Sequence, residues 1–220
     1  MRSAAEDYIK HIYTLQASGV KVSTRNLAEM LDISMPSVSE MVRKLTAEGY
    51  ITSKLYHGFK LTSKGEKLAL LQLRKHRLLE YFMINTLKYE WEDVHQEAEK
   101  LEHAVSEKFI NSLDYVLGFP KYDPHGHSIP DVKGKIQSRD SLMLSAAVTG
   151  SYYYVSSVND RSREILKYVK DLGIKLNSRI RISGMLAVDG SVIIYLNGKK
   201  HLLSKRIADS IFVSNKKVTK

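Results

Sequence analysis

The sequence predicts an α+β protein in three parts: helices that end in a β-hairpin, a helical middle segment, and a mostly β C-terminal segment. Helical periodicity covers most of the first 117 residues and is interrupted by two short β-rich runs. Three prolines and two glycines then cluster between residues 118 and 130. Beyond them the apolar residues gather in short runs bounded by turn signals, which indicates strands.

Two helices are expected at the start of the chain. Apolar side chains at helical spacing define the first helix, over 4–17. A second, shorter helix is capped by Ser23 or Thr24 and ends at Asp32. Only a few residues separate it from the next helix.

A third helix is predicted to begin near Ser34, because Pro36 in its first turn needs no amide donor, and to end at Gly49. Two β-rich runs follow, 50–53 and 59–62, joined by a turn that contains glycine. The order of helix, helix, turn, helix and hairpin is that of a winged helix-turn-helix, a DNA-binding fold.

The third helix has the two faces that a recognition helix needs. One face is apolar and packs on the preceding helix, while the other is polar and can enter a major groove. The predicted DNA-contacting residues of this helix lie at its start or on its polar face: Ser34, Pro36, Ser37, Ser39, Glu40, Arg43 and Lys44. Predicted phosphate contacts lie on the second helix and the wing: Thr24, Arg25, Lys54, Tyr56 and Lys60. The same residues would also fit a merely solvated surface, but three helices with a wing favour double-stranded DNA.

The middle segment is expected to hold two long helices, over 63–87 and from about Trp91 to Leu117. Four strands and one helix are predicted in the C-terminal segment: strands at 151–158, 178–184, 191–196 and 210–214, and a helix from Arg161 to Leu172. Asp-Gly and Asn-Gly pairs add hairpin signals, so this part is read as a small β-barrel. The predicted domains are three: 1–72, 73–133 and 134–220.

Potential metal ligands recur on the middle helices. Four lie at offsets of 0, 4, 7 and 8 on the second long helix: His95, Glu99, Glu102 and His103. Such offsets place side chains on one helix face within about two turns. Three further candidates lie on earlier helices: Asp7, His76 and Glu80. Imidazole and carboxylate donors suit Mn²⁺, Fe²⁺ or Zn²⁺. A charged helix face that forms only salt bridges is the alternative.

Composition excludes several classes of protein. The chain has no cysteine, which rules out disulfides, iron–sulfur clusters and a cysteine nucleophile. No apolar run is long enough to span a membrane, and the N-terminus lacks a signal-peptide pattern, so we expect a cytoplasmic protein with no membrane partner.

The net charge of +10 is concentrated late in the chain. Residues 121–220 hold 18 Lys and Arg against 8 Asp and Glu, whereas residues 1–62 hold 8 against 6. The prediction of DNA binding therefore depends on the winged helix and not on charge.

Three sequence runs resemble the diphtheria-toxin-repressor family of metalloregulators: EDYIKHIY at 6–13, RKHRLLE at 74–80 and VHQEAEKLEH at 94–103. The resemblance extends over the whole chain and implies an SH3-like C-terminal domain. Iron-responsive members carry Met and Cys where this chain has Asp7 and Glu99, so it resembles the manganese-responsive branch. Oxygen donors in place of sulfur favour manganese.

The resemblance implies two metal sites. The residues implied for the first are Asp7, Glu99, Glu102 and His103, with His76 as a further candidate. Those implied for the second are Glu80, Asp123, His125 and Asp160, with His76 and His95 as competing candidates. Some relatives have Cys where this chain has Asp123. Lys10 replaces a Glu of another manganese-type pattern, which argues against a two-metal cluster at the first site, and His127 is expected to be a solvated loop histidine.

The expected function is a homodimeric repressor of metal-uptake genes that binds operator DNA when loaded with Mn²⁺ or Fe²⁺. Dimerisation follows from two-fold operators, and the role in metal uptake is implied by the resemblance. A cation would remove the repulsion among the carboxylates and so favour the DNA-binding arrangement. Two alternatives remain: a metallohydrolase that uses the His/Glu cluster, and a winged-helix regulator that senses an organic ligand.

Overall fold

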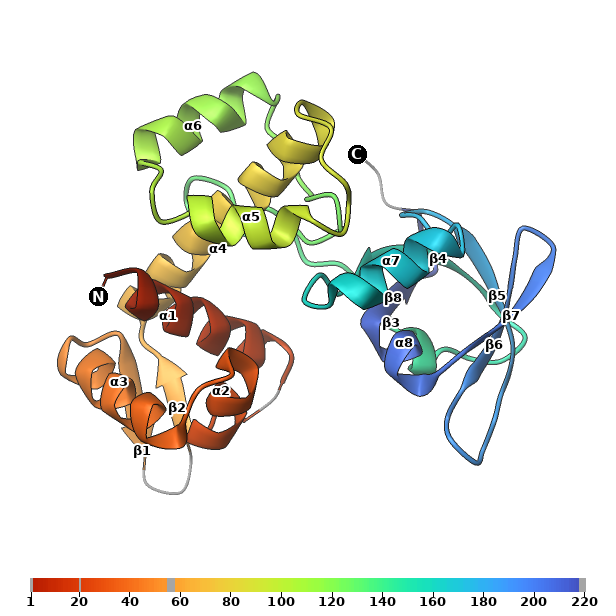
Figure 1. Ribbon diagram of the computed structural model, residues 1–220, viewed down its shortest axis with the longest axis horizontal. Helices are drawn as coiled ribbons and strands as arrows, with labels where there is room; N and C mark the ends of the chain where they lie inside the picture. Colours follow the sequence, from red (N-terminus) through yellow and green to blue (C-terminus); the bar gives the residue numbers. More distant parts are fainter. Residues whose placement is uncertain (1, 20, 55–57, 218–220) are drawn as a thin grey trace. The chain divides into compact units, whose positions relative to one another are not determined.

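The computed structural model describes residues 2–19, 21–54 and 58–217 (Figure 1). The chain divides into two compact units, each described here by itself. The first unit comprises Met1–Lys75 with Pro130–Lys135, and the second comprises His76–Ile129 with Ile136–Lys220. Among the described residues, no helix combines the length and apolar character needed to cross a membrane.

The first unit is the predicted winged helix-turn-helix. Its elements are three helices and an antiparallel hairpin: α1 (Arg2–Ala17), α2 (Thr24–Leu31), α3 (Met35–Ala47), β1 (Ile51–Lys54) and β2 (Gly58–Leu61). Ser23 caps α2 by accepting a hydrogen bond from the backbone N–H of Asn26. Ser34 caps α3 in the same way from Ser37. A single apolar core joins all three helices to the hairpin.

The helix α4 (Ser63–Asn85) follows the hairpin, and its last turns carry His76 and Glu80 into the second unit. Two shorter helices come next, α5 (Val94–Leu101) and α6 (Glu107–Val116). Leu78, Val94 and Ile110 from the three helices are fully buried together in one core.

The single helix predicted from Trp91 to Leu117 is wrong. The α-helix α5 ends before Glu102, and Ser106 begins α6 by accepting a hydrogen bond from the N–H of Phe109. A serine hydroxyl offers the backbone such an alternative to continuing a helix. As a result, His95 and Glu99 lie on α5, whereas Glu102 is its C-cap and His103 lies in the following turn.

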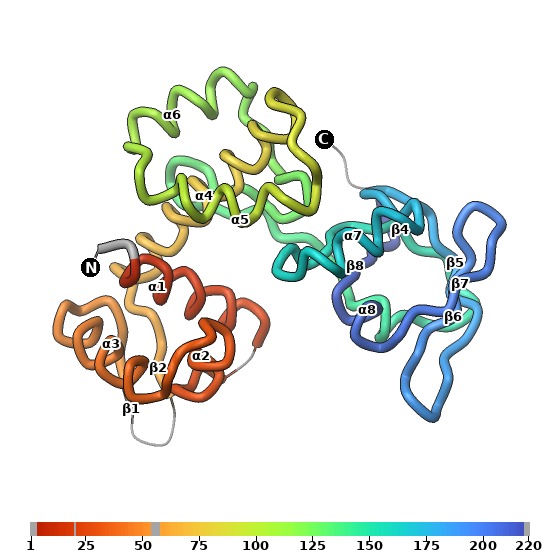
Figure 2. The backbone as a smooth tube through the Cα atoms, in the orientation of Figure 1, coloured from red at the N-terminus to blue at the C-terminus, as the bar shows by residue number. Residues whose placement is uncertain are grey.

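The C-terminal part of the second unit is an antiparallel six-stranded sheet in the order β3-β8-β4-β5-β6-β7. Its backbone is traced from teal to blue in Figure 2. Its strands are β3 (Leu142–Met143), β4 (Tyr152–Val158), β5 (Arg179–Met185), β6 (Val192–Leu196), β7 (Lys199–Leu203) and β8 (Ile211–Ser214). Its helices are η1 (Leu144–Ala146), α7 (Arg163–Asp171) and α8 (Lys205–Ser210). A large apolar core packs the sheet against its helices.

The α+β class and the order of the three parts are confirmed. The sheet, however, is open and not a closed barrel, because its outer strands β3 and β7 do not pair with one another. The elements β3, β7 and α8 were not predicted from the sequence. Asn197 and Gly198 have the positive φ angles of a tight hairpin turn, so β7 is the strand that this signal required.

Candidate metal centre

The polar face of α3 is presented as the sequence predicted. Val38, Val42 and Leu45 are buried against the rest of the unit. The remaining predicted contact residues of this helix are exposed, apart from the half-buried Lys44: Ser34, Pro36, Ser37, Ser39, Glu40 and Arg43. This face is therefore available to a major groove.

The predicted phosphate contacts are less uniform. Arg25 and Lys60 are exposed, Arg25 forms an ion pair with Glu29 at 2.9 Å, and Thr24 is half-buried. The side chain of Lys54 and all of Tyr56 lie outside the described residues.

Ile33 and Met35 are exposed at the start of α3 and were not among the predicted DNA contacts. An apolar side chain there can contact a thymine methyl group. The signal was an apolar residue at a position that cannot reach the core.

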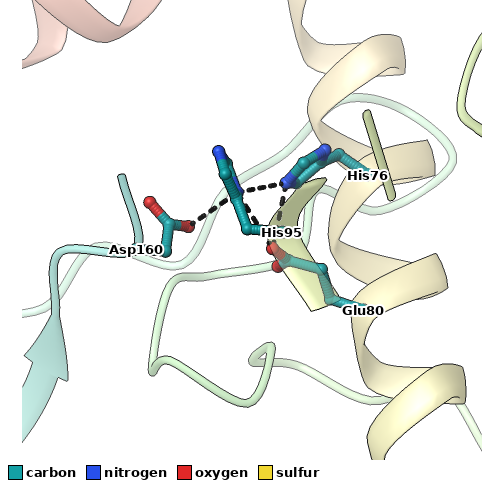
Figure 3. A group of neighbouring side chains, drawn as sticks. All are labelled: His76, Glu80, His95 and Asp160. Carbon is teal, nitrogen blue, oxygen red and sulfur yellow. Dashed lines mark hydrogen bonds and ion pairs between the residues drawn. The ribbon is translucent and has the colours of Figure 1, made fainter. Parts of the chain in front are cut away.

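In the second unit, Glu80 and Asp160 join two groups of metal-ligand side chains. The first group is His76, Glu80, His95 and Asp160 (Figure 3). His76 Nε2 lies 3.0 Å from Glu80 Oε1 and 2.9 Å from His95 Nδ1, and His95 Nδ1 lies 3.8 Å from Asp160 Oδ2. These four come from α4, α5 and the loop after β4, so tertiary packing brings them together.

The second group is Glu80, Asp123, His125 and Asp160, in which one potential ligand atom of each residue lies within 4.8 Å of the others. Its ligand atoms, unlike those of the first group, include several that form no hydrogen bond. Glu80 Oε2, Asp123 Oδ2 and His125 Nδ1 are buried and have no hydrogen-bond partner. Buried polar atoms without partners are costly, so three of them in one cluster point to a ligand.

The loop between α6 and β3 holds two of these atoms in place. Asp123 Oδ1 accepts hydrogen bonds from the backbone N–H groups of His125 and His127, both at 2.9 Å, which leaves Oδ2 free to face the cluster. His125 Nε2 lies 3.0 Å from the carbonyl oxygen of Trp91 and donates its hydrogen to it. Such a bond fixes the tautomer in which Nδ1 is the lone-pair donor.

Trp91 and Arg77 support the same loop. Trp91 stacks on His125 with ring centroids 5.2 Å apart and donates its indole N–H to the carbonyl of Pro124. Arg77 donates to the carbonyl of Ser128 at 2.5 Å and lies 3.6 Å from Asp123 Oδ2. Neither contact could be predicted from the sequence, because a contact to a loop follows no helical period.

The buried charges shift one another's titration. Burial alone would raise the pKa of Glu80, but the charge of His76, the facing His125 ring and hydrogen bonds from His76 and His95 hold it well below its usual value. Burial would lower the pKa of His125, yet the Glu80 carboxylate, 3.7 Å from its Nδ1, raises it to about 9. A divalent cation would replace the proton that His125 otherwise holds beside the Glu80 carboxylate.

The residues predicted for the other site are distributed over both units. Glu102 is fully buried and lies 2.6 Å from His76 Nδ1, and His103 Nε2 lies 3.6 Å from Glu102 Oε1. Glu99 is 44% exposed and lies 3.6 Å from His95 Nε2. Asp7 is on α1 in the first unit, so its union with the other three stays a prediction.

A winged helix in the same chain as a buried cluster of imidazoles and carboxylates defines a DNA-binding metalloregulator. Comparison with known families agrees. Residues 1–59 match the N-terminal DNA-binding domain of iron-dependent repressors, residues 62–131 match their metal-binding and dimerisation domain, and residues 142–215 match the FeoA domain.

Relatives match over nearly the whole length. The iron-dependent repressor IdeR of Mycobacterium leprae is 30% identical over 210 residues, which is 90% of both chains. A manganese-dependent transcriptional repressor, solved in complex with manganese, superposes with a TM-score of 0.92 at 37% identity, covering 96% of this chain and 100% of its own. The structure of the manganese regulator SloR superposes with a TM-score of 0.84 at 35% identity, covering 96% of this chain and 98% of its own.

The chain belongs to the iron-dependent, or diphtheria-toxin, repressor family. Members of this family are metal-dependent transcriptional repressors that bind DNA, and they are not enzymes. The resemblance predicted from three sequence runs is therefore confirmed, and the metallohydrolase alternative is not supported.

A substitution at Gly126 tests how closely the loop between α6 and β3 must approach the sheet. Its φ is +91°, and an added Cβ would lie 2.2 Å from the carbonyl oxygen of Ser156 on β4. Gly118 is the matched control, with φ of +73° and open space around an added Cβ. We expect Gly118→Ala to cost about 1 kcal/mol, from the left-handed backbone alone. Gly126→Ala should cost at least about twice as much, because contact with the sheet adds to that strain.

The measurement is chemical denaturation of the full-length protein in chelator, followed by Mn²⁺ titration. Gly126→Ala should also weaken Mn²⁺ binding, because the loop carries Asp123 and His125. Equal losses of stability for both variants would contradict the close approach of loop and sheet.

Proposed function

We propose that the protein is a cytoplasmic, manganese-dependent repressor that binds operator DNA as a homodimer and controls metal-uptake genes. One observation supports the metal dependence most strongly: buried oxygen and nitrogen atoms without partners converge in the second unit. They occur in a chain that also carries an exposed recognition helix. Manganese dependence is further supported by the similar structures of manganese-dependent regulators.

The donor atoms fit a divalent cation. The four residues Glu80, Asp123, His125 and Asp160 offer three carboxylates and one imidazole, and the described chain has no thiolate to compete with them. Such a set suits Mn²⁺, with Fe²⁺ and Zn²⁺ as alternatives. We assign the second site to these four residues and not to His76 and His95, because those two imidazoles already contact each other and Glu80.

The proposed first site consists of Asp7, Glu99, Glu102 and His103. A cation bound there would neutralise the carboxylates and hold the first helix to the metal-binding domain. Asp7 would then fix the position of the winged helix, Glu102 would be oriented by His76, and Glu99 would close the site from its more exposed side. This coupling need supply only about 1–3 kcal/mol to change operator occupancy 5- to 150-fold.

For DNA we propose major-groove contacts from the exposed face of α3 and phosphate contacts from Thr24, Arg25, Lys54, Tyr56 and Lys60. Lys44 is the least suited of the predicted set, because it is half-buried. We keep the division into domains 1–72, 73–133 and 134–220 as part of the same proposal.

The exposed apolar residues of α6 and the loop after it are proposed as the dimer interface. They are Phe109, Tyr115, Val116 and Phe119, and Val116 is 77% exposed. Exposed apolar patches of this kind mark interaction sites. They lie within the segment that matches a dimerisation domain.

A charge at this patch should separate the protomers. We expect Val116→Glu to shift the protein from dimer to monomer in light scattering coupled to size-exclusion chromatography. Val188→Glu is the matched control, because Val188 is 90% exposed on the β5–β6 connection and should not affect assembly. A Val116→Glu protein that stays dimeric at micromolar concentration would rule out this interface.

Operator binding should require the metal. The probe is a fluorescent duplex selected from random sequences with the manganese-loaded protein, and the readout is anisotropy in chelator and after adding Mn²⁺, Fe²⁺ or Zn²⁺. We expect metal to tighten binding 5- to 150-fold for the wild type, and Glu99→Ala to lose most of this gain. Glu97→Ala is the control, since Glu97 lies on the same helix and pairs with Lys100.

Equally tight binding by the wild type in chelator and in Mn²⁺ would contradict the proposed switch. It would instead favour a winged-helix regulator that responds to an organic ligand.

A further inference from the structure

His127 lies beside the second group of donors and has no role in the ligand sets above. Its Nδ1 lies 3.3 Å from Asp123 Oδ2 and 3.4 Å from Asp160 Oδ2. This nitrogen is buried and has no hydrogen-bond partner, and the side chain is only 23% exposed. The expectation of a solvated loop histidine is therefore wrong.

The backbone holds His127 at this position. Its N–H donates to Asp123 Oδ1, and its carbonyl accepts from the N–H of Asp123, each at 2.9 Å. The residue is thus tied to Asp123 through two hydrogen bonds, while its ring faces the other carboxylate oxygen, Oδ2, of the same aspartate. A histidine placed so is oriented by the loop itself.

Four of the buried atoms without a hydrogen-bond partner belong to potential metal ligands of this cluster: Glu80 Oε2, Asp123 Oδ2, His125 Nδ1 and His127 Nδ1. The two histidines are placed alike. His125 Nδ1 faces a carboxylate oxygen of Glu80, and His127 Nδ1 faces carboxylate oxygens of Asp123 and Asp160. Each buried nitrogen without a partner is unfavourable by itself. A cation contacted by both imidazoles and by the carboxylates would satisfy all four atoms.

We propose that His127 is the fifth ligand of the second cation site, through Nδ1, together with Glu80, Asp123, His125 and Asp160. This inference rests on the proposed metal-dependent function. The completed set has three carboxylates and two imidazoles and no sulfur, which suits the higher coordination number and harder ligands of Mn²⁺.

The test isolates this site in the full-length protein by using Asp7→Ala/Glu99→Ala as the background. Mn²⁺ affinity is measured by electron paramagnetic resonance of the free ion, and the ligating nitrogens are counted by pulsed measurements of their coupling to bound Mn²⁺. We expect one bound Mn²⁺ per chain with two coupled imidazole nitrogens. His127→Ala should leave one nitrogen and weaken binding about 10- to 100-fold.

Two further variants separate a ligand from a supporting residue. His127→Gln restores hydrogen bonding and much of the volume, so it would rescue affinity if His127 only positioned Asp123. We expect no rescue of either affinity or nitrogen count. His201→Ala, at a half-buried histidine on β7, is the control and should change neither.

Two coupled nitrogens in His127→Ala, or an affinity equal to that of the background protein, would overturn the inference while leaving the proposed function intact. Absence of Mn²⁺ binding in the background protein would overturn this site altogether. Metal-independent operator binding by the wild type would contradict the proposed function separately.

Discussion

The burial of Glu80 among imidazoles is the interaction on which the second unit depends. Its carboxylate is fully buried, with His76 and His95 on one oxygen and His125 facing the other. Removing an ionised carboxylate from water costs several kcal/mol unless charges and hydrogen bonds offset it. Glu80 and Asp160 also belong to both donor groups, so a charge placed in one group changes the electrostatic energy of the other.

This cluster explains several features that have no separate purpose in the fold. The loop between α6 and β3 approaches β4 at a glycine, presents one oxygen of Asp123, and is held by Trp91 and Arg77. Each of these contacts fixes an atom that faces the cluster. The domain that reads DNA has its own core and caps, so its fold does not depend on the cluster. A metal can therefore control DNA binding only if it links the DNA-binding domain to the metal-binding domain.

Functional residues could be predicted from the sequence where they follow helical spacing or cap a helix. His76 and Glu80 are one helical turn apart, and Ser34 caps the recognition helix, so both were predictable. The break after α5 was missed because Glu102 keeps helical backbone angles, which preserves the spacing that the prediction used. Asp123, His125 and Asp160 came from the family resemblance, since nothing local relates a loop to a distant helix. His127 was misread because its burial depends on backbone hydrogen bonds within that loop.

The position of the bound cation can be measured in an anomalous difference map, recorded at the manganese absorption edge, from crystals grown with saturating Mn²⁺. We expect a peak within bonding distance of Glu80 Oε2, Asp123 Oδ2 and His125 Nδ1. A protein that binds its operator in Mn²⁺ but shows no peak among these atoms would contradict this expectation.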